Sequence, residues 1–145
     1  MAAGPAAVEA LDRYLPWERG TDVRVRRSLV WFHGRARCDP TYSVAVLTEF
    51  LSEPDSRTRA EAAASLGLRG DPSAGPVLVR ALLHPDREVR LRAALALGRC
   101  GVRQAEGRLA ELARADREPD VRQVARVALR LLAGSGRGVR GGRRP

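Results

Sequence analysis

The chain has 145 residues, of which 44% are hydrophobic and only 4% aromatic, and its formal net charge is +9. This composition, rich in Ala, Leu, Val and Arg, favours helices and argues against an all-β fold. No apolar run is long enough to span a bilayer, and the first residues lack the basic and apolar regions of a signal peptide, so we expect a cytoplasmic protein without membrane insertion.

Residues 1–38 are expected to form capping helices or a degenerate first repeat. Val8, Leu11 and Leu15 fall on one helical face, and Asp22 is suited to cap a second helix that ends near Gly34. The alternation after Asp22 is also compatible with a strand. We favour a helix because this segment aligns with the repeat that follows.

Residues 39–133 contain three copies of one helical hairpin. The stretch Asp86–Gly101 (DREVRLRAALALGRCG) repeats the pattern of Asp55–Gly70 (DSRTRAEAAASLGLRG) at an offset of 31 residues, and a weaker copy begins at Asp120. A fixed period of this size is typical of stacked repeats. The first helices of the hairpins are expected at 41–52, 73–83 and 103–115, and the second helices at 57–68, 87–99 and 119–132.

The last segment, residues 134–145, is expected to be a disordered basic tail. It is rich in Gly and Arg and cannot offset the entropy cost of folding. Such a tail can contact nucleic-acid phosphates without sequence preference, or simply reflect solubility or GC-rich coding. Its arginines are Arg137, Arg140, Arg143 and Arg144.

The Pro-Asp turn, the Val-Arg step and the Ala-rich helix ending in Leu-Gly resemble HEAT-like repeats, especially the short repeats of the phycobilisome bilin lyases. The resemblance covers residues 39–134 and implies an all-α solenoid of about four helical hairpins, the first degenerate. It also implies a structural ladder of Asp and Arg between successive units. The pairs expected to supply it are Asp55 with Arg59, Asp86 with Arg90, and Asp120 with Arg122.

In HEAT solenoids the second helices line the concave side, which is the candidate binding surface. Arg mixed with apolar side chains suits a protein interface, although a solvated helix face would look similar. When the second helices of the units are aligned, one column of equivalent residues on this side contains Arg26, Glu61, Arg92 and Val124. Another contains His33, Leu68, Arg99 and Leu131. From these we take Arg26, Glu61, Arg92, Arg99, Val124 and Leu131 as partner-binding residues. In a third column, Phe32, Gly67, Gly98 and Arg130, the glycines would allow close packing.

The aromatic residues cluster in the first third of the chain. Trp31, His33 and Tyr42 form either part of a hydrophobic cap, which we favour, or a pocket or interface hot spot. The oligomeric state stays open.

Known catalytic motifs are missing from the sequence. It contains no GxxxxGK[ST], GxGxxG or HExxH pattern, neither histidine precedes a Glu, and Cys38 and Cys100 are far apart. We therefore predict no catalytic residues, no metal and no cofactor. The leading hypothesis is a non-enzymatic adaptor that binds a protein partner on its concave, Arg-rich surface. The alternatives are a nucleic-acid-associated protein using the tail, and a small lyase or isomerase, or a subunit of one, that resembles bilin lyases and acts on a hydrophobic small molecule.

Overall fold

The computed structural model describes residues 23–35, 40–71 and 73–135, and in these ranges it is helical without strands. The predicted all-α class is therefore confirmed. The expected helix before Asp22, Cys38 and residues 136–145 of the expected tail lie outside the described residues. The elements are α2 (Val23–Arg35), α3 (Pro40–Phe50), α4 (Ser56–Arg69), α5 (Ala74–Ala81), α6 (Arg87–Cys100), the 3-10 turn η1 (Arg103–Ala105), α7 (Glu106–Ala115) and α8 (Pro119–Ser135).

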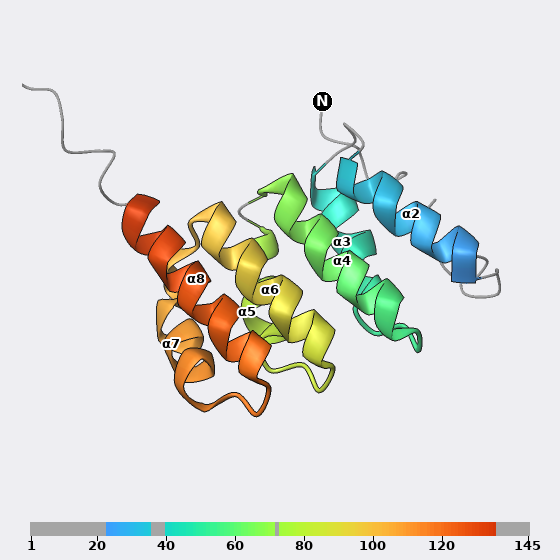
Figure 1. Ribbon diagram of the computed structural model, residues 1–145. Helices are drawn as coiled ribbons and strands as arrows, with labels where there is room; N and C mark the ends of the chain where they lie inside the picture. The colour runs from blue at the N-terminus through green and yellow to red at the C-terminus, as the bar shows by residue number, and fades with distance from the viewer. Residues whose placement is uncertain (1–22, 36–39, 72, 136–145) are drawn as a thin grey trace, which may run out of the picture.

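The helices form two layers (Figure 1). One layer consists of α2, α4, α6 and α8, which lie side by side, and α3, α5 and α7 lie behind them. Three hairpins, α3–α4, α5–α6 and α7–α8, thus follow α2. The helices of the α2–α8 layer pack extensively on one another, whereas α3, α5 and α7 pack mainly on the second helix of their own hairpin. Stacking of repeated hairpins in two layers is the arrangement of an α-solenoid.

The repeated sequence signature produces the same helix ends in successive units. Asp55 caps α4 by accepting a hydrogen bond from the backbone N–H of Thr58 at 2.8 Å, and Asp86 caps α6 in the same way. Gly70 and Gly101 follow these helices with φ of 61° and 69°, a left-handed conformation that glycine adopts without strain. The Asp and Gly positions therefore set the length of α4 and α6.

Close packing between units depends on a column of glycines. A Cβ on Gly67 would lie 2.3 Å from the Cβ of Ala96, and one on Gly98 would lie 2.6 Å from the Cα of Ala128. In α2 the equivalent residue is Gly34, because it packs against Ser65. The sequence alignment, which placed Phe32 in this column, was therefore wrong by two residues.

A ladder of arginines connects the hairpins, as the resemblance implied, but Arg59 and Arg90 pair with carboxylates of the next unit rather than with Asp55 and Asp86 of their own units. Arg59 forms an ion pair at 2.5 Å with Asp86 of the next unit, and its Nη1 donates to the carbonyls of Glu53 and Pro54 in its own turn. Arg90 repeats this arrangement with the carbonyls of its own turn. Each ladder arginine thus holds its turn closed and binds the next turn at the same time.

The last rung uses a carboxylate at a different position from the rung before it. Arg90 pairs with Asp116 at 2.8 Å, whereas Asp120 accepts a hydrogen bond from Arg87. Arg122 donates to the backbone carbonyl of Asp116, so the expected pair of Asp120 with Arg122 is not formed. The offset from Val89 to Val121 is 32 residues instead of 31, and Asp116 rather than Asp120 lies where Arg90 reaches it.

Candidate protein-binding surface

The exposed side of the α2, α4, α6 and α8 layer is called the B face here. A groove of about 190 Å³ lies on this face between α4 and α6. Its small side chains, Ala64, Gly67 and Ala96, belong to the segment where the two helices approach closely. The residues that line it are Arg35, Glu61, Ala64, Gly67, Leu68, Arg92, Leu95, Ala96 and Arg99.

Three of the residues expected to bind a partner come together in this groove. Glu61 is half-buried on α4, and Arg92 and Arg99 are exposed on α6. Leu68, which the same alignment placed in the column of Arg99, is also exposed in the groove. The groove therefore combines arginine, one carboxylate and leucine.

The two α8 residues of the expected surface lie outside the groove. Leu131 is exposed, whereas Val124 is partly buried and packs against the hydrophobic core. Both belong to the helix that flanks α6 on the side away from α4. They would add apolar area beside the groove rather than a wall of it.

Arg26 belongs to the ladder, which corrects its assignment to the binding surface. Its side chain is only 16% exposed, and its Nε lies 3.1 Å from a carboxylate oxygen of Glu53 in the next unit. The two-residue shift of α2 explains the error, because it aligns Arg26 with Arg59 and brings Ser28 and Arg35 onto the B face instead. The spacing of Gly34, Gly67 and Gly98 is the sequence signal that would have revealed the shift.

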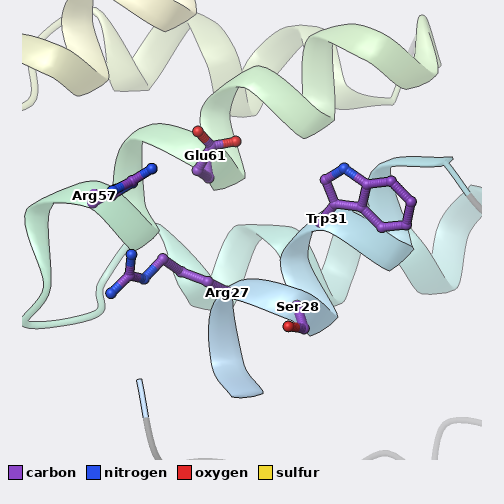
Figure 2. A pocket seen from close by; sticks show the side chains of 5 residues that line it. All are labelled: Arg27, Ser28, Trp31, Arg57 and Glu61. Atoms are coloured by element: carbon purple, nitrogen blue, oxygen red, sulfur yellow. The ribbon is translucent and has the colours of Figure 1, made fainter. Parts of the chain in front are cut away.

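A second, open hollow of about 380 Å³ lies between α2 and α4. Figure 2 shows Trp31 at one side of this hollow and Arg27 and Arg57 at the other, with Glu61 on α4. Trp31 is 56% exposed, and the guanidinium carbon of Arg35 lies 4.7 Å from the centre of its ring. Since Glu61 lines both hollows, they adjoin each other on the B face.

The structure separates Trp31 from the other two residues of the expected pocket or hot spot. His33 is only 7% exposed, and its ring centroid lies 5.5 Å from that of Tyr42 on α3. Burial, and secondarily the positive charge of Arg69, lowers the pKa of His33, so the imidazole is neutral at pH 7. Trp31 thus belongs to the B face, and His33 with Tyr42 to the packing between α2 and α3.

Arginine dominates the charge of the B face. The two hollows are lined by five arginines and one glutamate, an excess of four positive charges. Arg27 also lies 3.9 Å from Asp55, a distance at which an exposed ion pair is weak. Arg57, Arg92 and Arg99 are exposed. The face therefore favours ligands that carry carboxylates or other anions.

The described part of the chain offers little for other chemistry. It contains no cluster of His, Cys, Asp and Glu that could hold a metal ion, and no helix in it is long and apolar enough to cross a membrane. The thiol of Cys100 donates to the carbonyl of Gly67 at 3.2 Å, and burial raises its pKa. A raised pKa keeps this thiol protonated and weakly nucleophilic.

Comparison with known proteins connects this architecture to a family. Two overlapping stretches, residues 11–87 and 44–130, match the family model of HEAT repeats. The phycocyanobilin lyase subunit alpha of Microchaete diplosiphon is 36% identical over 79 residues, which are 50% of this chain and 27% of that protein. The chain therefore matches only about a quarter of the length of this relative.

Proposed function

The chain belongs to the HEAT repeat family, and we propose that it is a non-enzymatic adaptor that binds a protein partner on its B face. The observation that supports this proposal is the α4–α6 groove, where Arg92 and Arg99 of one repeat lie beside Glu61 and Leu68 of the repeat before it. A site assembled from two repeats exists only in the stacked solenoid. Extended surfaces of this kind are what repeat proteins use for binding.

The composition of the groove supports a protein as the ligand. Arginine is enriched at protein interfaces, where its stem packs on apolar groups while the guanidinium pairs with carboxylates. Leu68 and Leu95 offer apolar area beside Arg92 and Arg99. An acidic surface with apolar side chains between its carboxylates would match both properties.

The test is to capture partners with the full chain at moderate salt and to identify them by mass spectrometry. Each captured protein is then measured against the charge-reversed variant Arg92→Glu with Arg99→Glu. A matched control, Arg103→Glu with Arg114→Glu, makes the same charge change at exposed positions of the other layer. We expect the B-face variant to bind at least about tenfold more weakly, because like charges in an interface are costly, and the control to bind normally.

Equal binding of both variants by every captured protein would refute the B face as the interface. Nucleic acid that co-purifies and disappears when residues 136–145 are deleted would instead favour the tail as the binding element. This deletion leaves α8 intact, since the helix ends at Ser135.

The similarity to a phycocyanobilin lyase subunit supports a second candidate, a subunit of an enzyme that acts on a linear tetrapyrrole. Its test is the visible absorption of free phycocyanobilin, which should shift when the full chain is added and should not shift with the Arg92→Glu, Arg99→Glu variant. The α4–α6 groove, at about 190 Å³, is smaller than the roughly 300 Å³ at which pockets for drug-sized ligands begin. The open hollow beside Trp31 exceeds that size, at about 380 Å³, so a tetrapyrrole would fit there better than in the groove between Arg92 and Arg99.

A further inference from the structure

The α6 side of the groove shows a simple spacing. Arg92, Leu95 and Arg99 all line the groove, and they follow one another at intervals of three and four residues. This spacing gives one face of a helix, with the two arginines two turns and about 10.5 Å apart along the axis. The groove thus presents positive, apolar and positive groups in a line.

A second helix lying along α6 can match this line with the same spacing. Two acidic residues seven apart on such a helix are also about 10.5 Å apart, and an apolar residue between them faces the same way. Packed helices lie about 8–10 Å apart, a distance that side chains of Arg and Glu can bridge. Leu68, exposed on α4, would contact the apolar residue from the other side of the groove.

We infer that the B face binds an acidic amphipathic helix of the partner, with two acidic residues seven positions apart and an apolar residue between them. The inference rests on the proposed function and names the chemistry of the partner. It favours a protein helix over a nucleic acid, because Leu68 and Leu95 offer apolar area that a phosphate backbone would not use.

The groove also has unequal ends. At one end, Arg35 and Arg99 occupy the positions on either side of Leu68, according to the glycine column that aligns the helices. At the other end, Arg92 shares the groove with Glu61. The acidic residue of the partner near Arg99 therefore meets the more positive environment. Replacing the carboxylate of Glu61 by an amide should make the second acidic contact more favourable.

The experiment uses a fluorescein-labelled, Ala-based peptide of about 20 residues, long enough to form a partial helix, that contains the pattern Glu-x-x-Leu-x-x-x-Glu. The control peptide has the same composition, with the two Glu five residues apart and thus on different faces. Fluorescence anisotropy with the full chain should show binding of the first peptide at least about fivefold tighter than of the second, since two exposed ion pairs are at stake. Arg92→Ala with Arg99→Ala should remove this difference, Arg103→Ala with Arg114→Ala should preserve it, and Glu61→Gln should strengthen binding.

Equal affinity for the two peptides would overturn the inference, and so would single-stranded RNA of the same charge that competes as well as the matched peptide. These results are distinguishable from failure of the proposed function. If a captured partner is still lost with Arg92→Glu and Arg99→Glu, the B face stands and only the acidic helix is wrong. If captured partners and peptides are both insensitive to the two arginines, both proposals fall.

Discussion

Removing the side chain of Arg90 tests the ladder that holds the hairpins in register. Its Nε and Nη2 donate to the two carboxylate oxygens of Asp116 at 2.8 and 3.1 Å, and its Nη1 donates to the carbonyls of His84 and Pro85 at 3.0 Å. The side chains of Arg90 and Asp116 are only 7% and 6% exposed. The change Arg90→Ala therefore leaves a buried carboxylate without its ion-pair partner and two carbonyl groups without this donor.

Arg90→Ala should be strongly destabilising. Breaking a buried ion pair by removing one partner costs about 3–5 kcal/mol, a large part of the roughly 5–15 kcal/mol that stabilises a whole domain. The melting temperature should fall by about 10–20 °C. Arg87 on the same helix is a matched control, because its side chain is 45% exposed and pairs with Asp120 at the surface. Loss of an exposed pair costs about 0–1 kcal/mol.

The assay is urea unfolding of both variants, followed by far-UV circular dichroism. The midpoint of Arg90→Ala should fall much further than that of Arg87→Ala, with the slope of free energy against urea unchanged. Arg90→Lys should lie between wild type and Arg90→Ala, because lysine keeps the charge and loses the two-pronged geometry. Equal free energies of unfolding for Arg90→Ala and Arg87→Ala would refute the view that buried rungs stabilise the stack.

Two further predictions use the same unfolding assay. Burial acts to raise the pKa of Asp116, but hydrogen bonds from Arg90 and a backbone N–H outweigh it and hold that pKa below its ordinary value. The stabilising effect of the ionised Asp116 is thus complete above about pH 4 and is lost as the pH falls further. The difference in free energy of unfolding between wild type and Asp116→Asn should therefore become smaller only below that pH. A difference that stayed constant in acid would contradict this. Gly98→Ala should lower the free energy of unfolding by about 1–3 kcal/mol, because the added Cβ meets Ala128. Gly107→Ala should raise it by up to about 1 kcal/mol, because nothing lies within 4 Å of the added Cβ. A gain in stability at both positions would contradict close packing of the repeats.

The repeats were predictable because equivalent helices pack on one another in the same way and therefore need the same residues at equivalent positions. Asp at the start of the second helix, Gly at its end and small residues on its flank recur in α4 and α6 at an offset of 31 residues. The predicted alignment of the first unit was wrong because it matched the Val-Arg step of this unit, and not Gly34, with the later repeats. Gly34 is the better marker, since the approach of α2 to α4 leaves no room for a Cβ there.

The last rung and the aromatic cluster could not be read from the sequence for different reasons. The offset from Val89 to Val121 is one residue longer than the repeat period, and the sequence offers both Asp116 and Asp120 as the carboxylate that Arg90 reaches. Trp31 and His33 are two residues apart, which on a helix means about 200°. Although the two residues are near in sequence, they therefore lie on different sides of α2, with Trp31 exposed and His33 buried.

The same two-residue separation distinguishes ladder from B face in every unit. With the shift of α2 included, the ladder column reads Arg26, Arg59, Arg90 and Arg122, the same residue four times. The column two residues later reads Ser28, Glu61, Arg92 and Val124, four different residues. Arg59, Arg90 and Arg122 each donate to two backbone carbonyls of their own turn, which explains why this position repeats. If the partner has no internal repeats, the face that binds it must present different residues in successive units. Reversing the charge at Arg92 tests whether this variation serves recognition of the partner.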